Sequence, residues 1–287
     1  MSKEYFSDKE NGIKIANTEE ITINVFNGII SVYSEFKKSM ALKFPDKDDY
    51  GNLKDMNHGM FKERMLAVIP DFTVNTYGWI SALEEGEDFD KYALLDFIEF
   101  CWEHINDYEL GRYGLIFNEG DANRRKFADT INKIFERNGI GFRLNNKGEI
   151  ERVLPIQLEV LVRNYCHTGN DDELNKLIDE SIANIKKARI EDRQIAIEKL
   201  WDAFERIKTY YSSNKSTSAK ELVATAAEGS FEFEELLNVE MKALKDIGNN
   251  YRIRHHETNK IKIESIKHID YLFYRMMSMI SLLTSYI

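Results

Sequence analysis

Residues 189–211 read RIEDRQIAIEKLWDAFERIKTYY and predict the clearest element of the fold. The large apolar side chains in this stretch recur every three or four residues, which is the period of an amphipathic helix. They are Ile197, Leu200, Trp201, Phe204, Ile207 and Tyr211. Acidic and basic residues occupy the rest of the helix surface, so we expect one face to lie in a core and the other in solvent.

The same period recurs along the rest of the chain and predicts a mainly helical protein. Only three prolines interrupt 287 residues, which permits long helices because proline removes an amide donor. Thr18, followed by two glutamates, suits a helix start. Polar residues at 44–51 predict a loop, a further helix is expected to begin near Asn57, and residues 212–218 predict a polar connection. The other predicted helices cover 18–40, 92–105, a segment ending near 135, 156–167, a segment from about 173, 231–247 and 263–287.

Residues 139–153 break this helical pattern. Ile140, Phe142 and Leu144 alternate with other residues, and an Asn- and Gly-rich turn follows them, so the segment predicts a short β-hairpin. Pro155 closes the hairpin. We therefore expect two domains, a helix-rich domain over 1–155 that ends in the hairpin and a helical domain over 156–287.

Composition limits the classes of function. A net charge of −10 argues against a protein that coats nucleic acid by bulk attraction, so a nucleic-acid site has to be local. The first residues lack the apolar centre of a signal peptide, and residues 271–287 fall short of the roughly 20 apolar residues that cross a bilayer. We expect a cytoplasmic protein without a membrane partner. The two cysteines lack metal-like spacing, and no phosphate-binding or nucleotide-binding motif occurs, so no cofactor or metal is expected.

One segment has a positive net charge, opposite in sign to the net charge of the whole chain. Between Lys242 and Lys267, seven Lys and Arg residues stand against three acidic residues, a local excess of four positive charges. The segment contains Arg252, Arg254, His255 and His256. Histidine transfers protons near neutral pH and arginine binds phosphate oxygens bidentately, so this combination favours RNA cleavage without a metal.

Two other interpretations of the cluster stay open. It is also consistent with a solvated loop in which the arginines pair with Glu257 and neighbouring acids, each exposed pair contributing ~0–1 kcal/mol. Metal binding by His255 and His256 is disfavoured, because adjacent residues on a helix point about 100° apart. Arg163 to His167 also pairs arginine with histidine, but at a predicted helix end, where histidine commonly interacts with the helix dipole. His58 and His104 are isolated and are expected to be structural.

Three stretches resemble a known family. Residues 196–209 (AIEKLWDAFERIKT) and 247–257 (IGNNYRIRHHE), followed by DYLF at 270–273, resemble the C-terminal half of abortive-infection proteins of the AbiJ type. Residues 134–144 (IFERNGIGFRL) are similar to the end of their N-terminal domain. The resemblance implies a HEPN-like helical bundle in the second domain, a class that frequently acts as metal-independent endoribonucleases in bacterial defence.

The resemblance also implies roles for individual residues. Arg252 and Arg254 would hold the scissile phosphate, and His255 or His256 would act as general acid or base. Asn249, Asn250 and Glu257 would support them. Only three residues separate Arg252 from His256, which is shorter than the usual arginine-to-histidine spacing of HEPN domains.

The function implied by the resemblance is a phage-defence or growth-arrest protein of toxin type. The expected partners are RNA, a second copy of the chain, and an antitoxin or sensor protein. The alternative function is a non-catalytic helical module that binds RNA or protein.

Overall fold

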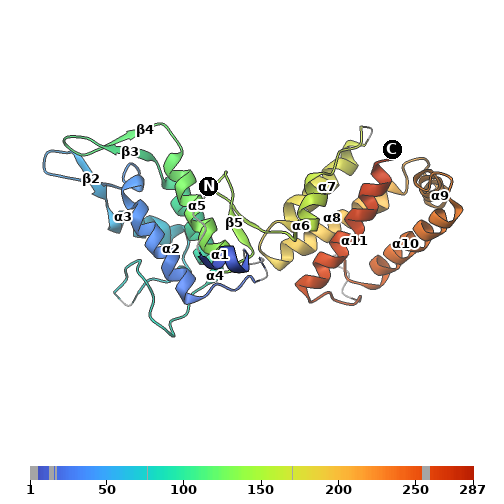
Figure 1. Cartoon of the computed structure of the whole chain (residues 1–287), viewed down its shortest axis with the longest axis horizontal. Coiled ribbons are helices and arrows are strands. Elements are labelled where there is room, and N and C mark those ends of the chain that lie inside the picture. The colour runs from blue at the N-terminus through green and yellow to red at the C-terminus, as the bar shows by residue number, and fades with distance from the viewer. Residues whose placement is uncertain (1–5, 13–15, 17, 76, 170, 254–258) are drawn as a thin grey trace. The chain divides into compact units, whose positions relative to one another are not determined.

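The chain forms two compact units, Met1–Val153 and Leu154–Ile287 (Figure 1). This computed structural model describes residues 6–12, 16, 18–75, 77–169, 171–253 and 259–287. Both units are helix-rich, and short antiparallel hairpins supply the strands. The predicted mainly helical class is thereby confirmed.

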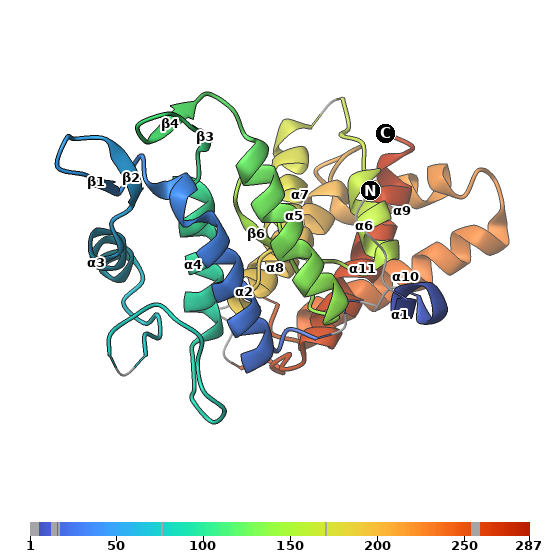
Figure 2. The ribbon, with the colours of Figure 1, turned by 60° about the vertical axis from the view of Figure 1, so that its left-hand side comes forward.

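The first unit places its longer helices around an aromatic core. Its helices are α1 (Phe6–Asn11), α2 (Ile23–Phe36), the 3-10 helix η1 (Lys37–Met40), α3 (His58–Val68), α4 (Lys91–His104) and α5 (Ala122–Arg137). Figure 2 shows α2, α4 and α5 running side by side, in agreement with their contacts. Tyr33 is buried against Phe61 and Phe97, with ring centroids 5.2 and 5.3 Å away, and burial raises the pKa of its hydroxyl. Such aromatic pairs bury large apolar areas and stabilise this core.

Three two-stranded hairpins complete the first unit. They are β1 (Pro45–Lys47) with β2 (Leu53–Met56), β3 (Asp107–Leu110) with β4 (Leu115–Asn118), and β5 (Phe142–Leu144) with β6 (Ile150–Arg152). The third confirms the hairpin expected over 139–153, with Phe142 opposite Arg152 and Leu144 opposite Ile150. Its turn includes Gly148, whose positive φ of 84° suits glycine.

The second unit is a helical bundle centred on α8. Its helices are α6 (Ile156–Arg163), α7 (Asp172–Ile185), α8 (Ile190–Ile207), α9 (Lys215–Ala226), α10 (Phe231–Asn250) and α11 (Ile266–Thr284). Helix α8 packs against α7 and α11. The expected apolar stripe of α8 is confirmed as core from Ile197 to Ile207, whereas Tyr211 lies beyond the helix and is exposed.

Three helix-borne asparagines tie loops and strands to the helices. The side-chain amide of each asparagine donates to the backbone carbonyl and accepts from the backbone N–H of one other residue. The pairs are Asn27 with Leu83 (2.9 and 2.8 Å), Asn132 with Leu144 (2.9 and 2.7 Å) and Asn175 with Thr168 (2.8 and 3.0 Å). A side-chain amide can make both bonds because it carries a donor and an acceptor, as a peptide group does.

Several predicted boundaries were wrong. Thr18 does not begin a helix; its backbone bridges to Ile140, and α2 begins only after Thr22. The loop predicted at 44–51 contains β1, and the β3–β4 hairpin was not predicted. The connection predicted at 212–218 contains the start of α9, where the Asn214 side chain accepts from the Ser216 and Thr217 amides. These N-cap bonds stabilise the start of α9. The polar composition of this stretch is also typical of a loop, which is why a connection was predicted.

Candidate functional site

The positively charged segment lies at the junction between α10 and α11. Helix α10 ends at Asn250, and the Arg252 amide donates to the Ile261 carbonyl oxygen at 2.8 Å. The Ile261 amide in turn donates to the Asn250 carbonyl oxygen at 3.1 Å. These two bonds bring together chain segments that precede and follow residues 254–258. The connection is therefore closed at its base.

Buried side chains fix this base on the bundle. Ile253 and Ile263, one on each side of the connection, are both buried in the core of the second unit. The Lys260 ammonium donates to the Gly248 carbonyl oxygen at 3.0 Å, which binds the returning chain to the last turn of α10. Gly248 itself lies against Trp201 of α8, where an added Cβ would fall 1.9 Å from the indole ring.

The structure places some of the predicted site residues and not others. Asn249 and Asn250 are exposed at the end of α10, and the Asn250 side-chain amide donates to the Asp246 carbonyl oxygen at 2.8 Å. Arg252 is half-buried at the closed base. Arg254, His255, His256 and Glu257 lie outside the described residues.

Exposed lysines precede and follow the closed base along the chain. The exposed lysines are Lys242 and Lys245 on α10, Lys262 before α11, and Lys267 in its first turn. His268 follows them and is also exposed. Lys262 lies 3.9 Å from Glu264, so one of these charges is partly balanced. Exposed cations of this kind can contact phosphates, since phosphate contacts come mainly from Lys and Arg.

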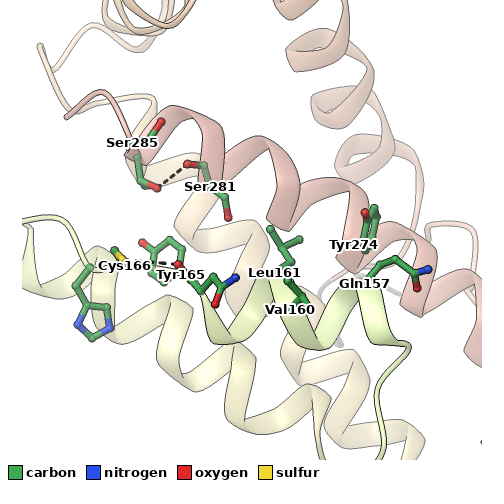
Figure 3. Close-up of a pocket in the computed structure, with 11 residues that line it drawn as sticks. Gln157, Val160, Leu161, Tyr165, Cys166, Tyr274, Ser281 and Ser285 are labelled. Carbon is green, nitrogen blue, oxygen red and sulfur yellow. Dashed lines mark hydrogen bonds between the residues drawn. The ribbon is translucent and has the colours of Figure 1, made fainter.

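The sequence interpretation missed a cleft in the second unit. It has a volume of about 530 Å³ and lies between α6 and α11. Figure 3 shows Gln157 and Tyr274 at one end and Tyr165, Cys166 and Ser285 towards the other. Gln157 and Leu161 of α6 and Asn164 at its C-cap follow helical spacing, which is the signal that the sequence contained.

His167 lines the cleft in a role that was not predicted. Its Nε2 lies 2.9 Å from a carboxylate oxygen of Asp179 on α7. The sequence predicted that His167 lies at a helix C-terminus. Helix α6 already ends at Arg163, so His167 lies beyond the helix end. Cys166 beside it is exposed, whereas Cys101 is buried and burial raises its pKa.

The first unit contains two histidines, His58 and His104. His104 Nδ1 lies 2.7 Å from the Phe100 carbonyl oxygen, and its ring packs on Phe44 and Phe100, as expected for a structural histidine. Burial is the main cause that lowers the pKa of His58.

A second cleft, of about 410 Å³, lies in the first unit and has an acidic lining. Asp96, Glu99 and Glu103 of α4 line it together with Lys147. Burial is the largest cause that raises the pKa of Glu99, which accepts a hydrogen bond from the Ile150 amide. This lining does not suit a phosphate, since like charges repel.

The described residues contain no candidate metal site and no candidate membrane span. Within the described ranges, no three His, Cys, Asp or Glu side chains are grouped so that they could hold a metal ion. No helix in the part of the chain that the structure describes is both long and apolar enough for a membrane span.

Comparison with known proteins covers mainly the first unit. Residues 4–168 match the family model described as AbiJ N-terminal domain 4, a match that extends through α6 and stops before α7. Comparison with curated proteins gives no match, and neither does comparison with solved structures. The family model covers more than half of the 287 residues. The chain therefore belongs to the AbiJ N-terminal domain 4 family, which indicates a role in abortive-infection phage defence.

Proposed function

We propose that this defence protein is a metal-independent endoribonuclease that acts in the cytoplasm, with a HEPN-like second unit as its catalytic part. The observation that carries the proposal is the closed base of the α10–α11 connection, where the Arg252 amide binds the Ile261 carbonyl oxygen at 2.8 Å. In the sequence, Arg252 of this base shortly precedes Arg254, His255 and His256, within a run of residues that carries excess positive charge.

The proposed reaction is an internal transesterification of RNA. The 2′-hydroxyl loses its proton to one histidine and its oxygen forms a bond to the adjacent phosphorus. The bond from phosphorus to the 5′-oxygen breaks, and this oxygen takes a proton from an imidazolium. The products are a cyclic phosphate and a free 5′-hydroxyl, and no oxidant or metal is needed. His255 and His256 are assigned the proton transfers, because imidazole titrates near neutral pH.

Arginine and neighbouring polar residues have supporting roles. Arg252 and Arg254 would hold the non-bridging phosphate oxygens and stabilise the charge that grows on them. Asn249, Asn250 and Glu257 would orient these side chains or the RNA. The exposed lysines on both sides of the base support binding of a phosphate chain.

A homodimer is part of the proposal. Leu236 and Val239 of α10 are 60% and 69% exposed, and Tyr271 of α11 is 59% exposed. Exposed apolar side chains on neighbouring helices are typical of a surface that a partner covers. Sedimentation of the wild-type chain beside Leu236→Glu tests this step; a wild-type monomer at micromolar concentration would contradict it. We assign sensing of the infection, or binding of an antitoxin, to the first unit.

An RNA-cleavage assay tests the catalytic roles. We expect His255→Ala or His256→Ala to lower the cleavage rate by about 10²-fold or more, the usual contribution of a general acid or base. Cleavage should persist in EDTA. His58→Ala, which changes a histidine in the other unit, is the matched control and should cleave as the wild type does. Equal rates for all four proteins would remove the histidines from the mechanism.

Expression in a bacterial host separates the enzyme from the binding-only alternative. A ribonuclease toxin should slow growth, and Arg254→Ala should abolish this effect at equal protein levels. A protein that binds RNA in a gel-shift assay but neither cleaves it nor slows growth would instead be the non-catalytic module.

A further inference from the structure

The residues that line the cleft between α6 and α11 favour an uncharged ligand that forms hydrogen bonds. Its residues are Gln157, Val160, Leu161, Asn164, Tyr165, Cys166, His167, Tyr274, Ser281, Thr284 and Ser285. Two of them are side-chain amides, two are tyrosines and three are aliphatic hydroxyls. None is Asp, Glu, Lys or Arg, and the one imidazole is already engaged by Asp179. The cleft therefore offers neutral hydrogen-bonding groups above an apolar floor.

Two hydroxyl groups in the wall are buried without hydrogen bonds of ordinary geometry. Among the residues that the structure describes, the Ser281 Oγ has no hydrogen-bond partner. The Tyr165 Oη is also buried and has no hydrogen-bond partner of ordinary geometry among the same residues. Buried polar atoms are ordinarily hydrogen-bonded, so such atoms in a cleft wall indicate that a ligand or water supplies the bond.

The volume of the cleft and its two tyrosines further limit the class of ligand that it can bind. A volume of about 530 Å³ lies within the usual range for small-molecule sites. Tyr165 and Tyr274 lie towards opposite ends of the cleft, on different elements (Figure 3). Tyrosine rings stack on planar heterocycles, and each side-chain amide can meet a donor and an acceptor on the edge of such a ring.

We propose that this cleft binds the uncharged planar ring of a nucleobase, carried by a free nucleoside or by an unpaired residue of an RNA strand. The absence of cationic lining disfavours a phosphate group as the main anchor. The proposal does not require ribonuclease activity, because the cleft residues are separate from the α10–α11 connection.

Binding of 2-aminopurine riboside to the full-length chain, followed by fluorescence, tests the proposal. We expect saturable quenching that at least one of the four common ribonucleosides reverses. Asn164→Ala and Ser281→Ala should each weaken binding by about 5- to 10-fold, the loss of one hydrogen bond. Asn238→Ala, which changes an exposed asparagine of α10, is the matched control and should bind as the wild type does.

The stability of Ser281→Ala shows whether weaker binding is caused by misfolding. This change removes a buried hydroxyl that lacks a partner, so the variant should melt at or above the wild-type temperature while it binds less ligand. If a short RNA binds more tightly than any nucleoside, and Asn164→Ala weakens that binding, the ligand is a base within an RNA strand. Equal affinity for nucleoside and RNA would identify the free nucleoside. No saturable binding at millimolar nucleoside, or binding that both cleft variants leave unchanged, would overturn the proposal.

Discussion

Gly248 occupies a position where any side chain would meet the indole of Trp201. An added Cβ would lie 1.9 and 2.1 Å from two ring atoms, far inside van der Waals contact. The same glycine accepts the hydrogen bond from Lys260 that binds the returning chain to α10. A single missing side chain thus lets α10 approach α8 and sets where the positively charged connection leaves the bundle.

We expect Gly248→Ala to lower the free energy of unfolding by about 1–3 kcal/mol, because overpacking outweighs the gain of about 1 kcal/mol in helix propensity. Urea denaturation measures the change. Gly169→Ala is the matched control, since a Cβ there meets nothing within 4 Å. The double variant Gly248→Ala, Trp201→Leu should lose less free energy of unfolding than the sum of the losses in the two single variants. Strictly additive losses would contradict the proposed clash.

At the scale of elements, the three asparagines that bond both backbone groups of one other residue connect helices to loops and strands. Asn175 on α7 bonds both backbone groups of Thr168, and both residues are buried. This clamp fixes the segment that follows α6 and carries His167 at the cleft.

Asn175→Asp tests the clamp with almost no change in shape. A carboxylate cannot donate to the Thr168 carbonyl oxygen, so we expect a loss of about 1–3 kcal/mol of stability at pH 7. Thermal or urea unfolding measures it. Asn238→Asp places the same charge at an exposed position of α10 and should change stability by less than about 0.5 kcal/mol. A similar loss in both variants would show that charge, and not the missing donor, is responsible.

A bidentate ion pair joins α10 to α11. Arg275 Nε and Nη2 donate to the two carboxylate oxygens of Glu240 at 2.7 and 2.8 Å. The hydrogen bonds from Arg275 lower the pKa of Glu240 below its ordinary value of 4.5. Because the folded state prefers the ionised carboxylate, the pair stabilises the fold above pH 4.5, and the stabilisation is lost as pH falls through the lowered pKa.

We therefore expect Glu240→Gln to cost about 0.5–1 kcal/mol at pH 7, a modest value because both side chains are partly exposed. The difference from the wild type should shrink towards zero as pH falls from 5 to 2. Urea denaturation at several pH values measures it, with Glu235→Gln on the exposed face of α10 as the control. A difference that is independent of pH would contradict the ion-pair explanation.

At the scale of the whole molecule, the chain contains two separately assembled cores. Phe97 is fully buried among aromatic rings of the first unit, and Phe273 of α11 is fully buried in the second. Each core is built from residues of its own unit, so we expect stability to be partly independent in the two.

Hydrogen exchange measures this independence. Phe273→Ala should cost about 3–5 kcal/mol and reduce amide protection across residues 154–287 far more than across residues 18–153. Phe97→Ala is the reciprocal control and should show the opposite pattern. Equal loss of protection in both units from either change would indicate one cooperative unit.

The sequence by itself predicted features that depend on local patterns. The stripe from Ile197 to Ile207 was confirmed because helical periodicity is a property of neighbouring residues. The β5–β6 hairpin was confirmed because its turn chemistry, with Gly148 at positive φ, is also local. The positively charged segment at 242–267 was visible as a run of residue types.

Only the tertiary structure decided features that depend on distant residues. The β1–β2 hairpin contains Pro45 and charged residues, so its pairing depends on backbone bonds that composition does not reveal. The contact of Gly248 with Trp201, the bonds of Asn27 with Leu83 and the cleft between α6 and α11 all join residues that are far apart in the sequence. Sequence patterns record which residues can be buried, whereas packing decides which buried residues meet.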